Sequence, residues 1–221
     1  SGFCVPALYL IELFGDERLK SIFCEKLAEN RWSACFCMTE PDAGTDVGNI
    51  RTKAIPKEDN TYEIEGSKIF ISAGMHDLTE NIVYIVVARL AGAIEGTMGL
   101  SCFIVPRFRA GCESSGNEDN HVRCVGLEDK MGLHGCVTAQ LTFGEDGPCK
   151  GYLLGEKENI GLRQLLYLMN EARITTGIYA LGMASSAYLN AADYARNRIQ
   201  GTDFRQSFNP RAAKVPIIKH L

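Results

Sequence analysis

The sequence of 221 residues lacks the patterns that mark a membrane or secreted protein. Charged residues interrupt every apolar run before it approaches the roughly 20 residues that a membrane-spanning helix needs. Residues 1–3 lack an initiator methionine, and no basic-then-apolar layout of a signal peptide follows them. We therefore expect the chain to begin partway into a longer protein, and we expect that protein to be soluble, with no membrane partner.

An excess of positive charge and a paired-cysteine motif are also missing. The net charge of -4 and the pI near 5.6 give no general attraction to nucleic acid. The nine cysteines are scattered, with no Cys-x-x-Cys pair among them. They are typical of reduced core thiols in a cytosol-like compartment, and not of a disulfide framework or zinc site. The expected location is cytoplasmic, or the mitochondrial matrix if the organism is a eukaryote. His76, His121 and His220 are too scattered for a metal site.

Hydrophobic patterning divides the chain into three regions. Over residues 5–30, apolar residues recur at three- and four-residue steps around the break Phe14–Asp16, which predicts two short helices joined by a Gly-Asp turn. Over residues 33–143, short alternating runs separated by turn residues predict a β-sandwich or barrel. From Asn159, a candidate N-cap, to Gln200 the pattern predicts one long helix.

The segment FCMTEPDAGTDVGNIRTKA, residues 36–54, begins like a buried strand and then breaks into an acidic turn. Hydroxyls at Thr39 and Thr45, next to a permissive Gly44, can hold a polar heteroaromatic ligand, because a hydroxyl adds no charge that the ligand must desolvate. The same residues also fit a hairpin whose Asp and Thr side chains bond their own backbone. The turn alone leaves both interpretations open.

A second segment, EGSKIFISAG at residues 65–74, places Phe70 and Ser72 on one face of a strand, because side chains two apart point the same way. The spacing from TEPDAGTD through SKIFISAG to the helix containing MNEARITTG resembles the acyl-CoA dehydrogenase family. The resemblance covers essentially the whole chain. HVRCVGLEDKMGLHGCVTAQLTF followed by GYLLGEKENIGLRQLLYLMNEARI looks closest to the larger methylthiopropanoyl-CoA dehydrogenase-like branch.

The resemblance implies an α+β fold in which a middle β-barrel or sandwich is flanked by two helical domains, both partial in this chain. The implied domains are 1–32, the end of an N-terminal helical domain; 33–150, the middle β-domain with the flavin and acyl-CoA site; and 151–221, the start of a C-terminal helical bundle.

The resemblance also implies that the turn belongs to an FAD site. It places Phe36, Met38 and Thr39 along the isoalloxazine ring. Gly44 and Thr45 follow in the turn, where the hydroxyl of Thr45 serves the flavin phosphate or the acyl-CoA chain.

Three further positions are implied to touch the cofactor. Phe70 stands where many members have Trp near the flavin edge, and Ser72 stands where Thr commonly bonds N5. Arg198 matches an arginine that reaches the flavin pyrophosphate of a neighbouring subunit, a task that suits the guanidinium fork. The alternative for Arg198 is a solvated helix end, where a cation favours the C-terminal dipole.

On the long helix, the resemblance implies that Asn170 and Arg173 bind the acyl-CoA. The alternative for Arg173 is a structural pair with Glu171 or with a neighbouring helix. Some relatives carry the catalytic carboxylate directly before this arginine, where this chain has Ala172. Glu171 is rotated about 100° from that position and is not expected to be catalytic. The base is expected beyond Leu221.

The implied reaction is the α,β-dehydrogenation of an acyl-CoA thioester. A carboxylate removes the α-proton, the β-carbon delivers hydride to flavin N5, and hydrogen bonds to the thioester carbonyl stabilise the developing charge. Electrons would pass to an electron-transferring flavoprotein, and the protein would be a homodimer or homotetramer, because the flavin site of this family spans subunits. The alternatives are an acyl-CoA oxidase, a flavoprotein that protects DNA, which the acidic composition disfavours, and a non-catalytic homologue.

Overall fold

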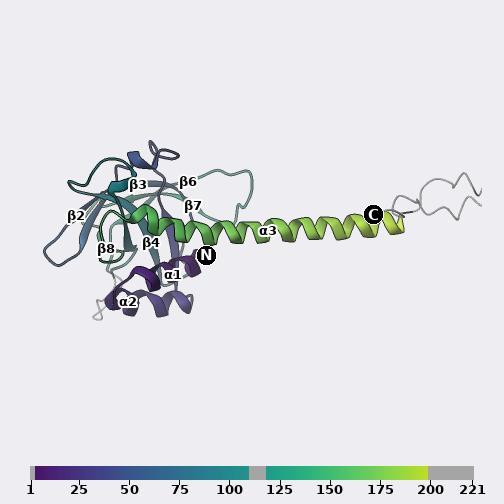
Figure 1. Ribbon diagram of the computed structural model, residues 1–221, viewed down its shortest axis with the longest axis horizontal. Coiled ribbons are helices and arrows are strands. Elements are labelled where there is room, and N and C mark those ends of the chain that lie inside the picture. The colour runs from purple at the N-terminus through teal and green to yellow at the C-terminus, as the bar shows by residue number, and fades with distance from the viewer. Residues whose placement is uncertain (1–2, 110–117, 199–221) are drawn as a thin grey trace, which may run out of the picture. The chain divides into compact units, whose positions relative to one another are not determined.

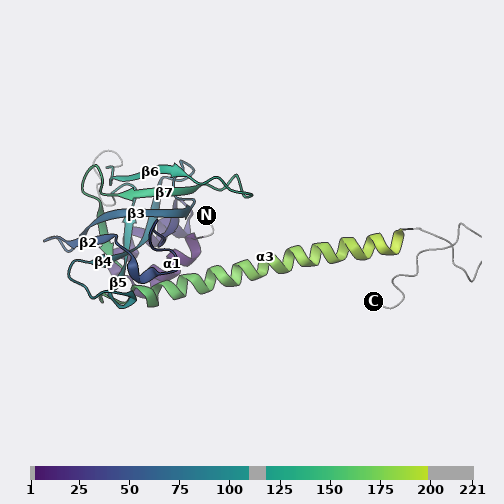
Figure 2. The same cartoon turned by 90° about the horizontal axis from the view of Figure 1, so that it is seen from above.

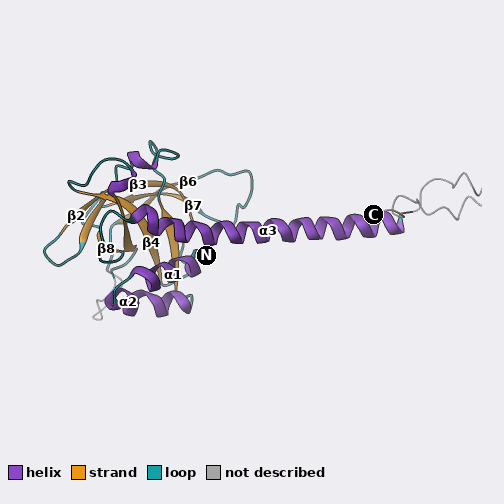
Figure 3. Ribbon diagram, viewed as in Figure 1, coloured by secondary structure: helices purple, strands orange, loops and turns teal. Residues whose placement is uncertain are grey.

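The structure is a computed structural model that describes residues 3–109 and 118–198. It divides into two compact units, residues 1–172 and 173–221. The first unit holds the helices α1 (Cys4–Phe14) and α2 (Glu17–Ala28), the strands β1 (Trp32–Cys37), β2 (Lys53–Pro56), β3 (Tyr62–Ser72), β4 (Asn81–Leu90), β5 (Leu100–Pro106), β6 (Val122–Leu127), β7 (Thr138–Phe143) and β8 (Lys150–Leu153), and the short 3-10 helices η1 (Val47–Asn49) and η2 (Thr97–Gly99). Helix α3 (Gly161–Asn197) begins in the first unit and supplies the described helical residues of the second. Figures 1 and 3 show these elements.

The two short N-terminal helices confirm the periodicity-based prediction. Asp16 caps α2, because its carboxylate accepts a hydrogen bond from the Leu19 amide at 2.7 Å. The preceding Gly15 amide donates to the Ile11 carbonyl at 2.7 Å and closes α1. The Gly-Asp pair therefore ends one helix and starts the next.

The strands form one eight-stranded sheet with the order β1-β4-β5-β8-β3-β7-β6, and β2 pairs with both β3 and β4. Strands β1 and β4 run parallel, whereas β3, β7 and β6 are antiparallel neighbours that lie side by side in Figure 2. The predicted β-domain is confirmed. Sequence patterning did not predict β6 or β8, because β6 buries one of its six residues and β8 is only four residues long.

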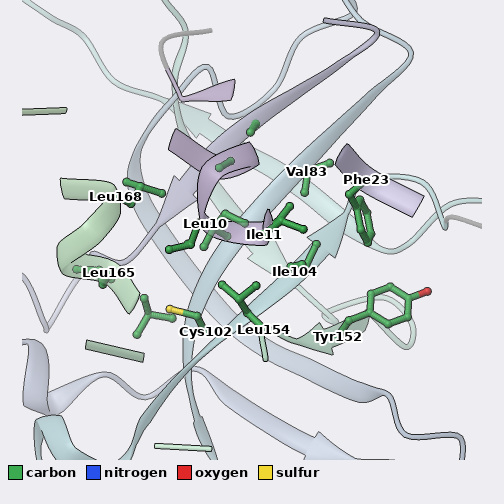
Figure 4. Packing of buried hydrophobic residues seen from close by; sticks show 14 of the residues in the cluster. Leu10, Ile11, Phe23, Val83, Cys102, Ile104, Tyr152, Leu154, Leu165 and Leu168 are labelled. Carbon is green, nitrogen blue, oxygen red and sulfur yellow. The ribbon is translucent and has the colours of Figure 1, made fainter. Parts of the chain in front are cut away.

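Two apolar cores lie on opposite faces of the central strands. One core packs α1, α2 and the start of α3 against the sheet, and Figure 4 shows its residues, including Leu10, Phe23, Ile104 and Leu165. The other core lies between the central strands and the β3, β6 and β7 layer, and it contains Tyr84 with Phe143. Strands β4 and β5 are buried along nearly their whole length, because both of their faces are covered.

Helix α3 begins slightly later than the sequence predicts. The first intrahelical hydrogen bond runs from the Gln164 amide to the Ile160 carbonyl at 3.1 Å, so Ile160 and not Asn159 occupies the N-cap position. Asn159 has a left-handed backbone (φ 63°), and its amide donates to Ser101 Oγ at 2.8 Å. The N-cap prediction is wrong because Asn159 anchors the preceding loop to β5. No helix within the described ranges is long and apolar enough to cross a membrane.

Candidate flavin-facing site

The end of β1 and the end of β3 meet in space. The Ile69 amide donates to the Thr39 carbonyl at 2.9 Å, and Lys68 Nζ donates to the Met38 carbonyl at 2.9 Å. These bonds join two segments that lie about thirty residues apart along the chain. The structure thus brings together the two segments that carry Phe36 to Thr39 and Phe70 to Ser72.

Phe70 has an unusual backbone conformation. Its φ is 61°, in the left-handed region, at the point where the register between β3 and β7 shifts between Lys68 and Ile71. A bulky side chain rarely adopts this conformation, and it persists only where the surroundings enforce it, often at a functional site. The ring is 58% exposed, whereas Ile71 is buried and Ser72 is half-buried. The bulge therefore presents an aromatic ring outward without burying it in the chain's own core.

Hydrogen bonds from three other segments of the chain hold Ala73 and Gly74, the residues that follow β3. The Ala73 amide donates to the Val137 carbonyl at 2.6 Å, and its carbonyl accepts from Cys35 Sγ at 2.8 Å. The hydroxyl of Tyr84 donates to the Gly74 carbonyl at 2.9 Å. A Cβ on Gly74 would lie 2.9 Å from the Cβ of Ala139, which leaves no room for a side chain. These contacts hold the main chain behind Phe70 and Ser72.

The turn that follows β1 closes on its own backbone. The amides and carbonyls of Glu40 and Ala43 bond each other reciprocally, each at 3.1 Å. Among the described residues, no Asp or Thr side chain of the turn bonds the turn backbone as the hairpin interpretation expects. The exposed Thr45 and the half-buried Thr39 have hydroxyls without a hydrogen-bond partner among the described residues. Among the described residues, a Cβ on Gly44 would meet Thr39 alone, at 3.9 Å, so packing against them does not require glycine there. The backbone closes the turn, and its threonine hydroxyls remain available to a ligand.

A buried ion pair lies behind the turn, and sequence reasoning missed it. Lys68 is fully buried, and its Nζ lies 2.8 Å from Glu40 Oε1. Glu40 also accepts hydrogen bonds from the Arg51 amide at 2.7 Å, from the Thr52 amide at 3.0 Å and from the Thr52 hydroxyl at 2.5 Å.

Burial and pairing shift the pKa values of both Glu40 and Lys68 downward. Burial pushes the pKa of Glu40 upward, but the Lys68 ammonium and the hydrogen bonds from Thr52 and Arg51 outweigh burial and hold that pKa below its usual range. Burial also lowers the pKa of Lys68, and Glu40 offsets this only in part. Glu40 is therefore ionised near neutral pH.

The other expected site residues lie on α3 or, for Arg198, directly after it. Asn170 and Glu171 are exposed on the part of α3 that belongs to the first unit, whereas Arg173 and Arg198 belong to the second unit. The guanidinium of Arg198, directly after α3, lies 5.9 Å from the centre of the Tyr194 ring in the last turn of that helix. The structure brings the β1 and β3 segments together, and the roles of all the expected site residues stay predictions.

The cysteines are free thiols wherever the structure describes them. Cys35 and Cys37 are fully buried, as expected for core residues on the β1 face opposite Phe36. Within residues 3–109 and 118–198, no group of three His, Cys, Asp or Glu side chains can hold a metal ion. Cys112 lies outside the described residues.

Comparison with known proteins identifies the family. The family model for the acyl-CoA dehydrogenase middle domain matches residues 35–145, half of the chain. A 3-methylmercaptopropionyl-CoA dehydrogenase of Ruegeria pomeroyi is 41% identical over 97% of this chain and 35% of its own length. A broad-specificity linear acyl-CoA dehydrogenase of Mycobacterium tuberculosis is 43% identical over 87% of this chain and 32% of its own length. The chain belongs to the acyl-CoA dehydrogenase family.

A solved structure agrees with this assignment. Butyryl-CoA dehydrogenase from Megasphaera elsdenii matches with a TM-score of 0.68 and 29% identity, over 94% of this chain and 49% of that protein. The expected α+β fold is therefore confirmed. The chain spans about a third of the length of the two curated relatives described above.

Proposed function

We propose that this chain carries the flavin-facing part of an FAD-dependent acyl-CoA dehydrogenase, which oxidises the α,β-bond of an acyl-CoA thioester. The observation that carries the proposal is the junction of β1 and β3, where a left-handed Phe70 lies in the segment bonded to the end of β1. Membership of the family supports the choice of flavin and acyl-CoA as ligands. In this proposal, the domains are 1–32, 33–150 and 151–221, as the sequence predicts.

The residues at the junction fit a flavin. An isoalloxazine ring offers flat apolar faces and a polar edge, and it requires an apolar surface next to neutral hydrogen-bond donors. Phe70 supplies an exposed aromatic ring, and the half-buried Phe36 and Met38 supply apolar surface on the other segment. Thr39 and Ser72 supply hydroxyls that have no partner within the described part of the chain. This set of side chains adds no charge next to the ring.

In the proposed mechanism the chain binds and orients its ligands. Bound FAD supplies the hydride acceptor. Phe36, Met38 and Phe70 would exclude water from the ring, while Ser72 would donate a hydrogen bond to its N5 edge and the Thr39 hydroxyl would bond its polar edge. The proposal keeps the expectation that the carboxylate that takes the α-proton lies beyond Leu221 and is not Glu171.

The substrate and partner contacts belong to the same proposal. Thr45 bonds the flavin phosphate or the acyl-CoA chain, with Gly44 beside it in the turn, and Asn170 and Arg173 contact the acyl-CoA. Electrons pass to an electron-transferring flavoprotein, and the protein assembles as a homodimer or homotetramer in the cytoplasm. The similarity to a 3-methylmercaptopropionyl-CoA dehydrogenase and to a linear acyl-CoA dehydrogenase supports an acyl-CoA thioester substrate.

The visible absorption spectrum tests the proposal. The protein expressed from its complete gene should purify with flavin bands, and anaerobic addition of saturated acyl-CoAs should bleach them, because oxidation of the substrate reduces the flavin. Acyl-CoAs of several chain lengths should bleach the bands to different extents and so identify the preferred substrate. A protein that binds no FAD, or whose bound flavin no acyl-CoA bleaches, would refute the proposal. The reduced flavin of an oxidase is reoxidised by air, whereas that of a dehydrogenase is reoxidised by electron-transferring flavoprotein, so comparing the two rates separates these alternatives.

The Arg198→Ala variant tests the contact with the flavin pyrophosphate. Loss of a bidentate phosphate contact should weaken retention of FAD on the order of tenfold. Arg196→Ala is the matched control, because Arg196 is an exposed arginine two residues earlier, in the last turn of α3. Retention of FAD is measured after gel filtration and by titration of the flavin-free protein. If both variants retain FAD equally well, Arg198 does not contact the flavin pyrophosphate, and the alternative of a solvated helix end holds.

A further inference from the structure

The ion pair between Glu40 and Lys68 joins three segments of the chain at the proposed flavin site. Lys68 precedes the bulge of β3, and its ammonium donates both to Glu40 and to the Met38 carbonyl. The other bonds of Glu40 come from Arg51 and Thr52, on the segment that leads into β2. The turn after β1, the start of β2 and the bulge of β3 therefore share one buried carboxylate.

Stability does not explain why this pair is buried. Lys68 is fully buried and the side chain of Glu40 is 7% exposed, so both charges have lost their hydration. A buried ion pair repays this desolvation poorly, and well-packed apolar residues of similar size are often at least as stable. What an ion pair with several directed hydrogen bonds provides is a single defined arrangement of the groups that it joins.

The ion pair joins the two segments of the proposed site, the end of β1 and the bulge of β3. The Lys68 ammonium fixes the Met38 carbonyl, and the next residue, Ile69, donates its amide to Thr39. Phe70 follows directly with its left-handed backbone, which is stable only if the surrounding bonds enforce it. We propose that Glu40 and Lys68 are positioning residues, which fix the bulge of β3 against the end of β1 and so set the spacing between Phe70 and the Met38–Thr39 segment for a flavin ring. This inference rests on the proposed function for the identity of the ligand.

The double variant Glu40→Gln/Lys68→Met tests the inference in the protein expressed from its complete gene. It removes both charges at nearly constant size, and so avoids leaving one buried charge without its partner. Asp42→Asn is the matched control, because Asp42 lies in the same turn and pairs with Arg51 at 3.3 Å, but both side chains are more than 70% exposed. Circular dichroism and thermal unfolding establish that each variant is folded.

Two measurements then separate positioning from support of the fold. In the folded double variant, we expect FAD to bind on the order of tenfold more weakly, the loss that accompanies about one ligand hydrogen bond, with a changed flavin spectrum. Hydrogen exchange should be faster at residues 69–74 and unchanged in α1 and α2. Asp42→Asn should match the parent protein in both measurements.

The outcomes distinguish this inference from the proposed function. A folded double variant with parental FAD affinity, flavin spectrum and exchange overturns the positioning role. If the double variant does not fold, Glu40→Gln alone is judged by the same criteria, because the amide oxygen can still accept from Arg51 and Thr52. If the parent protein binds no FAD, the proposed function fails. Hydrogen exchange then decides alone whether the pair fixes the bulge: faster exchange at residues 69–74 retains that part, and unchanged exchange overturns it.

Discussion

The left-handed backbone of Phe70 predicts that glycine at this strand position is more stable than alanine, the reverse of the usual order in a strand. Phe70 is 58% exposed, so about two fifths of its surface is buried, and removing the ring costs roughly 1 kcal/mol whichever small residue replaces it. Phe70→Ala keeps the left-handed strain, which is about 1–2 kcal/mol for a residue with a Cβ. Phe70→Gly relieves that strain. The greater freedom of glycine in the unfolded chain, however, lowers the free energy of unfolding by about 0.4–1 kcal/mol. We therefore expect Phe70→Gly to be more stable than Phe70→Ala by about 1 kcal/mol.

Thermal unfolding of the flavin-free protein measures this difference. For a domain of this size, 1 kcal/mol corresponds to about 2–4 °C in Tm. Glu65 serves as the control position, because it is an exposed residue of the same strand that is absent from the residues with positive φ. There Gly should be less stable than Ala, by about 0.5–1 kcal/mol. If Phe70→Gly is no more stable than Phe70→Ala, the bulge does not hold Phe70 in the left-handed conformation.

Three further predictions concern stability, thiol reactivity and pH. Gly74→Ala should lower the free energy of unfolding by about 2 kcal/mol, because its Cβ would lie 2.9 Å from Ala139 Cβ; chemical denaturation measures this. Iodoacetamide at pH 8 should modify the exposed Cys136 and not Cys102, because burial raises the pKa of Cys102 to about 12 and leaves roughly one thiolate in 10⁴; peptide mass spectrometry reports the sites. The pKa of Glu40 is lowered on folding, so ionised Glu40 stabilises the fold fully above its unfolded pKa near 4.5. This stabilisation is lost as the pH falls through the lower pKa of the folded state. Glu40→Gln should therefore make the free energy of unfolding fall less steeply with pH on the acid side.

Each of these has an outcome that contradicts it. An unchanged denaturation midpoint for Gly74→Ala would mean that the main chain behind Phe70 can move apart. Modification of Cys102 at the rate of Cys136 would mean that β5 opens readily in the native protein. An equally steep acid limb in Glu40→Gln would assign the acid sensitivity to other carboxylates.

Much of the fold follows from periodicity. Apolar steps of three and four predict α1 and α2, and the buried run of residues 82–87 predicts β4. Periodicity fails where few residues carry the pattern: Val122 is the one buried position of β6, and its other residues are half-buried or exposed. The start of α3 is misplaced because Asn159 is a preferred N-cap by residue type, while tertiary contact with Ser101 places it in the loop.

The candidate site is predicted in part from the sequence. The resemblance names Phe70 and Ser72, but strict alternation does not predict the bulge that shifts the register before Ile71. The ion pair behind the site was missed because lysine and glutamate are almost never fully buried unless paired. One signal was available: Lys68 lies four residues after Ile64, so it falls on the buried face of β3.

The parallel pairing of β1 with β4 determines when the site can form during folding. Strand β1 lies at one end of the strand order, and β4 is its strand partner in the described sheet. Parallel pairing requires the whole intervening chain, which carries the turn, β2 and β3. On a ribosome, a nascent chain that has reached Ser72 has every β-domain residue of the site but no β4 for β1 to pair with. Assembly of the proposed flavin-facing surface is therefore a long-range event that waits for β4, although its residues are among the first to be synthesised in the β-domain.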